Sequence, residues 1–434
     1  MLDTLFEILK AAGVYAWEVA DEKTEGWEFY FIRRALDQNR AKCVEHITVK
    51  VYQRIGDDGV GSAAAELPPT ATAEEAKKLV SSLAYQATLA PNRAYTLHQP
   101  GPAHAAPRPA APVDVPANAK DYLAAMAAVP ETADEDLNSY EIFTAAVTRR
   151  FVTSEGIDVT ETYPSSMLEA VVNARSDGRE IELYRMYKSG SCDAEGLRRD
   201  LTRAMAYGRD RLHTVPTPPL GTADVVFSTV DAEEIYRYFI ARLDPSRVLR
   251  SMSDWKLGEP IEPDVRGDRV TLEALRALPN SSRNRAFDAE GAPIRDVVML
   301  RAGVPEHYLG GRMFSCYMGL TDSFIPGNFA VSGGAKSEAE LRQGRYLEVV
   351  EFSDFQVDAM TGDIFGEIRL AYWHDGAAVT PVSGGSVSGN MHDFIKEMYL
   401  SAETVQFDNF RLPAVTKLCG ATVTGIDASE GAEA

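Results

Sequence analysis

Polar and apolar residues alternate most clearly between Cys43 and Arg54, where Ile47, Val49 and Val51 share one side of the chain. A period of two is typical of a strand with one buried face. The run Trp27–Arg33 has the same character, so we expect a strand there as well. Before these runs, the apolar residues at positions 2, 5, 6, 8 and 9 have helical spacing, which predicts an amphipathic helix at the N-terminus.

Helical periodicity recurs further along the chain behind residues that favour helix starts. Thr72 and Glu75 have the spacing of a capping box, and apolar residues then recur at every third or fourth position. Two aspartates, Asp193 and Asp231, precede similar runs. The predicted helices are the one that begins after Thr72, a short one at 119–128, Asp193–Leu212, Asp231–Leu243 and 337–343.

From Tyr140 onward the pattern changes to a meander of strands. Glu155-Gly156 and Asp177-Gly178 lie where hairpin turns are needed. The predicted strands are Ala145–Val152, Ile157–Tyr163, Met167–Asn173, Glu180–Tyr187 and, after the next helix, the buried run Ala223–Ser228.

A complete β-hairpin is visible from Glu348 to Trp373. β-Branched and aromatic residues lie on both sides of the polar segment Asp358–Asp363, which contains a glycine and predicts the turn. His374-Asp375-Gly376 offers a further tight turn after the second strand. The second half of the chain is therefore expected to be rich in strands, with few helices.

Proline-rich stretches divide the chain. Residues 99–116 hold six prolines, too many for a helix or a central strand, so we expect a long exposed loop with poor order. Val215–Gly221 breaks all periodicity and marks a domain boundary. We predict an α+β fold with an N-terminal domain of antiparallel strands and helices (1–217), a β-rich C-terminal domain (218–426) and a flexible tail (427–434).

The net charge of −20 argues against partners that are themselves strongly negative. Nucleic-acid affinity depends on clustered Lys and Arg, so we expect no nucleic-acid partner, and an anionic membrane surface is disfavoured for the same reason. No apolar run approaches the roughly 20 residues that span a bilayer. The N-terminus lacks the basic region of a signal peptide, and we expect a cytoplasmic protein with no membrane partner.

Cysteines and short catalytic motifs add little chemistry. The four cysteines, at positions 43, 192, 316 and 419, are far apart and form no C-x-x-C pair, which favours reduced thiols over a zinc ribbon or a disulfide framework. The sequence contains no H-E-x-x-H, no phosphate-binding glycine motif and no G-x-S-x-G elbow.

The remaining candidates have structural readings that outweigh the chemical ones. His374 and His392, each followed by an aspartate, lie in turn contexts, which favours solvated turn residues over metal ligands. Glu233 and Glu234 are neighbours on a predicted helix and point about 100° apart, which favours a solvated helix face over a carboxylate dyad. Cys419 lacks companion ligands, and a single cysteine is usually a small buried residue.

Several short segments in the second half occur together in the order known from one family. They are Pro218–Gly221, Asp224–Ser228, Phe287–Pro293, Pro326–Phe329, Gly344–Val349, Met360–Phe365 and Ser386–Asn390. In this order and spacing they resemble the TldD/PmbA family, the so-called modulators of DNA gyrase, which comprises metallopeptidases and their partner subunits. The first half resembles the family more loosely, through its first helix and Tyr163–Ser166.

The resemblance implies a barrel-like C-terminal domain and, in catalytic members, a zinc site. In those members a helix after the Val-Val-Phe-Ser-type strand carries His-Glu-x-x-x-His, and a later cysteine completes the site. The corresponding helix here, Asp231–Phe239, has no histidine, whereas Cys419 resembles the third ligand position. One thiolate cannot hold zinc alone. We therefore expect no catalytic residue and no bound metal in this chain, which resembles the TldE (PmbA) branch.

The leading hypothesis is a non-catalytic subunit of a TldD/TldE-type metallopeptidase complex that acts on unfolded or short peptides. Its partner would be a TldD-like subunit that carries the zinc, and a peptide would bind along a sheet edge. The alternative is a stand-alone homodimer that binds peptides or serves as a scaffold without hydrolysis. A third hypothesis is an active hydrolase with His374, His392 and Cys419 as ligands.

Overall fold

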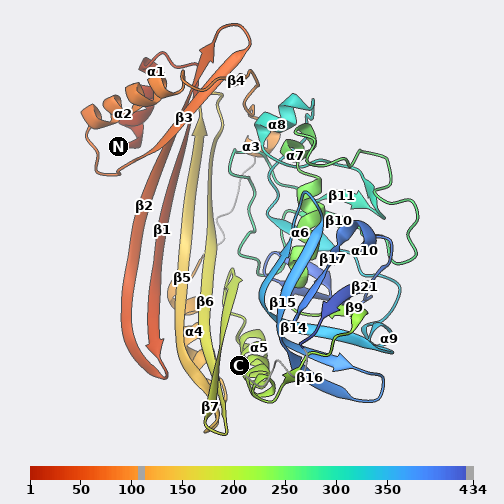
Figure 1. The fold of residues 1–434 in the computed structure, drawn as a ribbon. Helices are drawn as coiled ribbons and strands as arrows, with labels where there is room; N and C mark the ends of the chain where they lie inside the picture. Colours follow the sequence, from red (N-terminus) through yellow and green to blue (C-terminus); the bar gives the residue numbers. More distant parts are fainter. Residues whose placement is uncertain (106–112, 427–434) are drawn as a thin grey trace.

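Alternating apolar residues build the N-terminal half around one antiparallel sheet. The computed structural model describes residues 1–105 and 113–426, and Figure 1 shows this sheet as the long curved strands. Ile47, Val49 and Val51 are buried on one side of β2 (Ala35–Ile55), so the strand predicted there is confirmed. The seven strands have the order β4-β3-β2-β1-β5-β6-β7. The others are β1 (Ala16–Ile32), β3 (Gly59–Leu67), β4 (Asn92–Arg93), β5 (Glu135–Thr153), β6 (Asp158–Ser176) and β7 (Arg179–Ser189).

Helices cover one face of this sheet at both of its ends. At one end α1 (Leu2–Ala11) and α2 (Ala73–Gln86) bury Leu5, Val80 and Leu83 against it. At the other end α4 (Val115–Ala127) and α5 (Ala194–Leu212) bury Tyr122 and Leu201. Figure 1 shows the two pairs far apart along the strands. The opposite face of the sheet is therefore left to other contacts.

Two of the helix starts predicted from the sequence are confirmed as side-chain caps, whereas Asp231 precedes α6 without a side-chain cap hydrogen bond. Thr72 and Glu75 form a complete capping box at the start of α2. Asp193 accepts a hydrogen bond from the Gly196 amide at 3.0 Å and so caps α5. Each cap satisfies backbone N–H groups that have no partner inside the helix.

The strands predicted at Ile157–Tyr163 and Met167–Asn173 are a single strand, β6. It pairs with β5 without a break through Pro164, which lies opposite Ala146. A proline inside a sheet removes a backbone donor and is therefore tolerated mainly at an edge. Pro164 lies beyond Ser166, which is the last residue of β6 that pairs with β7. Pro164 therefore sits where β6 is a free edge, and the strand continues. The strand predicted at Trp27–Arg33 is likewise only the end of β1, which begins at Ala16.

The expectation of a loop through 99–116 is wrong for part of that segment. α3 (Pro102–Ala105) is a short helical turn, and α4 begins at Val115, earlier than predicted. Proline is tolerated in the first turn of a helix because its missing N–H has no partner there. Pro116 occupies that first turn, and the Asp114 side chain caps the helix. Residues 106–112 and the predicted tail 427–434 lie outside the described residues.

A closed barrel dominates the C-terminal half. Its strands follow the order β14-β9-β21-β17-β15, and β15 pairs back with β14 to close the ring. The predicted hairpin is confirmed as β14 (Tyr346–Val357) and β15 (Asp363–His374). In its turn Asp358 accepts hydrogen bonds from two backbone amides and Gly362 has a φ of 78°. The barrel is completed by β9 (Gly221–Phe227), β17 (Ser386–Asn390) and β21 (Thr416–Thr424).

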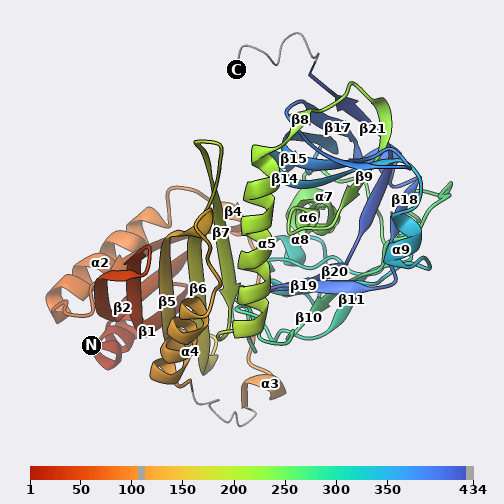
Figure 2. The same cartoon turned by 90° about the horizontal axis from the view of Figure 1, so that it is seen from below.

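A second sheet of six strands faces the barrel, and α6 (Ala232–Arg242) lies between them (Figure 2). The sheet has the order β12-β11-β10-β13-β20-β19. Its strands are β10 (Leu272–Leu275), β11 (Val297–Arg301), β12 (Val304–Pro305), β13 (Asn328–Val331), β19 (Thr404–Phe407) and β20 (Phe410–Pro413). Remaining elements are α7 (Pro245–Leu249), α8 (Arg312–Tyr317), α9 (Glu338–Leu341), α10 (Met391–Phe394), β8 (Val215–Pro216), β16 (Val379–Ser383) and β18 (Met398–Leu400). The α+β fold with a barrel-like C-terminal region is confirmed.

The two halves meet through polar contacts and through a small apolar cluster in which Phe287 packs with Phe151, Ile157 and Val159. Tyr372 of β15 donates a hydrogen bond to Asp210 of α5 at 2.6 Å, and Arg149 donates to the backbone oxygens of Asp288 and Ala289. In Figure 2 α5 lies between the long sheet and the barrel. None of the described helices is long and apolar enough to cross a membrane.

We expect Asp193→Ala to lower the free energy of unfolding by about 1 kcal/mol, because the start of α5 then loses its capping oxygen. Chemical denaturation followed by circular dichroism measures the change. Asp193→Asn, which keeps an oxygen at the cap, should cost clearly less. Equal losses for both variants would contradict the assignment of the cap.

Candidate functional site

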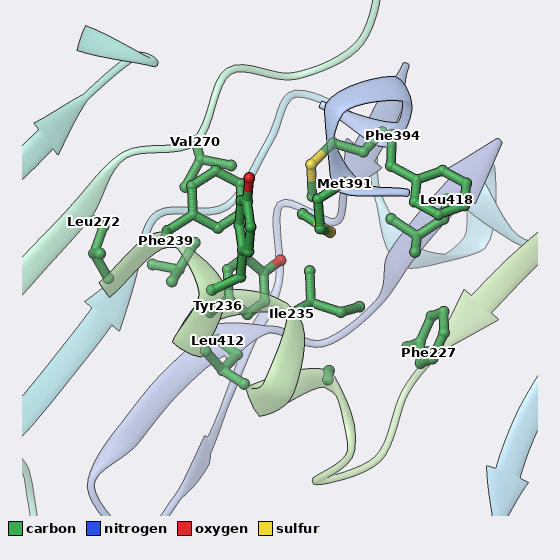
Figure 3. Close-up of a cluster of buried hydrophobic side chains, with 14 of the residues drawn as sticks. Phe227, Ile235, Tyr236, Phe239, Val270, Leu272, Met391, Phe394, Leu412 and Leu418 are labelled. Carbon is green, nitrogen blue, oxygen red and sulfur yellow. The ribbon is translucent and has the colours of Figure 1, made fainter. Parts of the chain in front are cut away.

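Helix α6, which the family resemblance assigns to the zinc ligands, is packed into the main hydrophobic core. Figure 3 shows Ile235, Tyr236 and Phe239 pointing among core side chains of the neighbouring strands. All three are fully buried. The Tyr236 hydroxyl lies 2.7 Å from the Thr416 hydroxyl of β21, which satisfies both groups inside the core. The inner side of the helix therefore offers packing and no ligand.

The outer edge of α6 carries an ion-paired cluster. Arg237 reaches Glu233 at 2.8 Å and Glu234 at 3.3 Å, so both carboxylates share one guanidinium. The Arg237 guanidinium also lies over the ring of Phe410, 4.7 Å from its centre. Adjacent helical residues point apart, but the long arginine side chain spans the gap between them.

The reading of Glu233 as a solvated residue is wrong. Only 9% of Glu233 is exposed, whereas 44% of the Glu234 side chain is. Burial raises the pKa of the Glu233 carboxyl to about 7, against the smaller opposing effect of Arg237. This carboxyl therefore changes its charge near neutral pH, a property usually found at functional sites.

Cys419 lies on the other face of β21 from α6. Thr416 and Leu418 point into the core that contains α6, whereas Lys417 and Cys419 alternate with them and point outward. Burial raises the pKa of the Cys419 thiol to about 12, with the negative charge of Asp224 as the next cause, so the thiol is protonated at neutral pH. The strand therefore separates Cys419 from the helix with which the resemblance pairs it.

His374 and His392 are at opposite ends of β15. His374 is the last residue of that 12-residue strand, and His392 follows Met391, whose amide bonds to Gly362 just before the strand begins. At about 3.3 Å per residue the two ends are roughly 35 Å apart. These histidines cannot ligate one ion, so the structure does not bring together the ligands of the third hypothesis.

His374 is not a solvated turn residue as predicted. Its ring stacks on Tyr346 with centres 4.1 Å apart, and its Nε2 lies 3.7 Å from Glu348. Burial lowers the pKa of His374. Ser228 donates a hydrogen bond to Glu348 at 2.6 Å, not to the imidazole. A nucleophilic serine needs a base to take its proton, so this arrangement is structural.

A second polar cluster joins the two halves of the chain beside the start of α6. Arg185 of β7 pairs with Glu351 of β14, and both are largely buried. Burial raises the pKa of Asp231 to about 6, and the nearby charge of Glu351 adds to the effect. Sequence reasoning missed this cluster because its members come from strands and a helix that are distant in the chain. The one available signal was an acidic residue, Glu351, directly between the apolar residues Val350 and Phe352.

The residues of this chain do not fit the zinc ion that the resemblance implies for catalytic members. Among residues 1–105 and 113–426, no three His, Cys, Asp or Glu side chains form a group that could hold a metal ion. Zinc favours imidazole and thiolate donors, yet the outer edge of α6 offers two carboxylates already paired with Arg237.

Comparisons with known proteins agree with this fold. Residues 220–425 match the sequence model of the PmbA/TldA metallopeptidase C-terminal domain. TldE from Thermococcus kodakarensis superposes with a TM-score of 0.77 at 14% identity, covering 98% of this chain and 100% of that one. A candidate modulator of DNA gyrase from Thermotoga maritima gives 0.76 at 16% identity, covering 98% and 99%. A similarly described protein from Bacteroides thetaiotaomicron gives 0.78 at 16% identity, covering 98% of both chains.

The sequence match identifies residues 220–425 as a domain of the metallopeptidase-related PmbA/TldA type. The resemblance to the TldD/PmbA family seen in the sequence is confirmed. No curated protein matches the chain by sequence.

We expect the stability of the protein to depend on Glu233 in a defined pH window. Because its folded pKa of about 7 lies above the ordinary 4.5, protonation favours the folded state. The stability that Glu233 contributes is fully present below pH 4.5 and is lost as the pH rises through 7. Glu233→Gln keeps an acceptor for Arg237 but cannot titrate. As the pH rises from 4.5 to 8, the free energy of unfolding of Glu233→Gln should therefore increase relative to that of the wild type.

Glu234→Gln is the matched control for this prediction, because it alters the exposed carboxylate that pairs with the same guanidinium. Its pH profile should run parallel to that of the wild type. A parallel profile for Glu233→Gln as well would show that the buried carboxyl does not titrate in this window.

Proposed function

We propose that this chain is a non-catalytic subunit of a TldD/TldE-type peptidase complex and works in the cytoplasm. Its partner is a TldD-like subunit that supplies the zinc, and the substrates are unfolded or short peptides. The observation that carries the proposal is α6, where aromatic packing and the Glu233–Arg237–Glu234 cluster stand in place of metal ligands.

The open face of the long sheet supports a partner subunit. On the side that α4 and α5 do not cover, Tyr30, Glu141, Glu169 and Met186 lie side by side across four strands. In Figure 1 α4 lies behind these strands and no helix lies in front of them. Met186 is 48% exposed, and Tyr184 in the next row is 54% exposed. Exposed apolar surface in such a row is typical of an interaction site.

Two carboxylates within this face indicate the charge of the partner. Glu141 and Glu169 are directly opposite each other on β5 and β6. Like charges at such positions destabilise a sheet. Burial raises the pKa of Glu141, and Glu169 and Glu28 add to the effect. A partner with Lys or Arg at this position would remove the repulsion. A second copy of this chain, joined through the same face, would bring more carboxylates together, so a different chain is favoured.

The edge of the same sheet suits a peptide. β7 ends the strand order, and edge strands pair with extended peptides through their backbone groups. This chain would then bind and orient a peptide, while the partner subunit performs the hydrolysis.

Purified alone, the chain is expected to hold far less than one zinc per subunit and to cleave no peptide. Co-expression with a subunit that carries His-Glu-x-x-x-His should give a complex with one zinc per partner and peptide hydrolysis. Metal analysis, mass determination in solution and a fluorescent peptide assay measure these outcomes. Stoichiometric zinc together with activity in this chain alone would refute the proposal, and a stable homodimer indifferent to the partner would favour the scaffold alternative.

Charge reversal on the open face is expected to weaken the complex. Glu141→Lys with Glu169→Lys removes the carboxylates that a basic partner would meet, and we expect at least a tenfold loss of affinity by calorimetry. Glu74→Lys, on the exposed side of α2, is the matched charge control and should bind like the wild type. An unchanged affinity for the double variant would place the interface elsewhere.

A further inference from the structure

A polar pocket opens on the outer face of the barrel, on the side of β21 away from α6. Its volume is about 580 Å³, within the range of about 300–1,000 Å³ typical of small-molecule sites. Cys419 and Lys417 of β21 and Asp224 of β9 line it, together with residues from α9 and from the segment after α10. None of these groups takes part in the function proposed above.

The charge balance of the pocket differs from that of the whole chain. The chain has 64 acidic and 44 basic residues, yet the pocket is lined by equal numbers of each. The basic residues are Arg266, Lys336, Lys396 and Lys417, and the acidic residues are Asp224, Glu340, Asp393 and Glu397. The carboxylates of the pocket would repel a polyanion, and its basic side chains would repel a polycation. An apolar ligand would leave both unsolvated.

Most of these charges are already paired within the pocket. Lys417 lies 3.0 Å from Asp224, and this pair is partly buried at the base. Lys396 lies 3.2 Å from Asp393, and Arg266 lies 2.5 Å from Glu397. The pairs form a neutral lining. Two residues depart from this pattern, and both come from the α9 side.

Lys336 is the first of them. Its ammonium lies 3.9 Å from the centre of the Tyr399 ring, which holds it by a cation–π contact. Among the described residues no carboxylate lies within ion-pair distance of it. The ammonium is therefore positioned at the pocket wall with its charge open to a ligand.

Glu340 is the second. One of its carboxylate oxygens, Oε2, accepts from the Ser337 amide and hydroxyl in the capping box of α9. Within the described part of the chain, the other oxygen accepts no hydrogen bond. Lys336 lies close enough to contribute to the lowered pKa of Glu340, for which the hydrogen bonds from Ser337 are the main cause. The pocket thus presents one ammonium and one carboxylate on the same lining, each with capacity for a further partner.

We propose that this pocket binds a small zwitterion of the amino-acid class, with the ligand carboxylate on Lys336 and the ligand ammonium on Glu340. The remaining ion pairs supply a polar and electrically neutral surround for the rest of the ligand. A ligand with both charges satisfies both groups at once, and a singly charged ion satisfies only one.

Calorimetric titration of the full chain tests the site with glycine and alanyl-alanine as probes, and with acetate and methylammonium as singly charged controls. We expect a zwitterion to bind at least tenfold more tightly than either control. Lys336→Gln should weaken that binding at least tenfold. Glu340→Gln should do the same, and because glutamine also serves in a capping box, α9 remains capped.

Lys77→Gln, on the exposed side of α2, is the control for loss of one surface cation and should bind like the wild type. Circular dichroism and Tm verify that each variant is folded. No binding by either zwitterion, equal binding of acetate, or unchanged binding by Lys336→Gln would overturn the proposal. Peptidase activity of the complex is measured separately. A failure of the ligand proposal can therefore be distinguished from a failure of the subunit proposal.

Discussion

The C-terminal half depends on one side chain, Arg242 at the end of α6. This side chain connects the helix, the hairpin turn and the barrel. Almost fully buried, it forms an ion pair with Asp254, donates to the backbone oxygens of Met252 and Met360, and lies over the Trp255 ring. Met360 belongs to the hairpin turn that closes β14 and β15, so one guanidinium fixes the helix, the turn and the barrel together. These contacts use both terminal nitrogens of the guanidinium and compensate for burying its charge, whereas Nε has no hydrogen-bond partner among the described residues.

Because α6 is held at its end and packed along its inner side, the helix has little freedom to become an open metal site. A ligand on the inner side would displace Tyr236 from the core, and the outer edge already contains a cation in Arg237. Restoring a zinc site would therefore require repacking as well as new ligands. We propose that this chain is non-catalytic. On that proposal, the packing of its core, and not only the lack of a few ligand side chains, prevents it from binding zinc.

Local chemistry and the alternating burial of strand residues could be predicted from the sequence, whereas the burial of a polar side chain by distant elements could not. The capping residues Thr72 and Asp193 and the turn at Gly362 act within a few residues, so their patterns are visible in one dimension. Glu233 has the pattern of a solvated helix face, and its burial is imposed by elements far along the chain, near Phe410. Cys419 points outward because it alternates with the buried residues Thr416 and Leu418, and which face of β21 meets α6 is set by the tertiary fold.

The pairing of β1 with β5 has a consequence for how the chain is made. Ala20 pairs with Phe151, so β1 and β2 leave the ribosome long before the strand that completes the sheet on the other side of β1. Strand pairings between residues far apart in the sequence form slowly. Until β5 pairs with it, the unpaired edge of β1 can pair with other chains and aggregate. β1 is densely charged, with Asp21, Glu22 and Lys23 in succession. Charged side chains on an unpaired strand edge disfavour pairing with a wrong partner, so these residues also serve the correct assembly of the sheet.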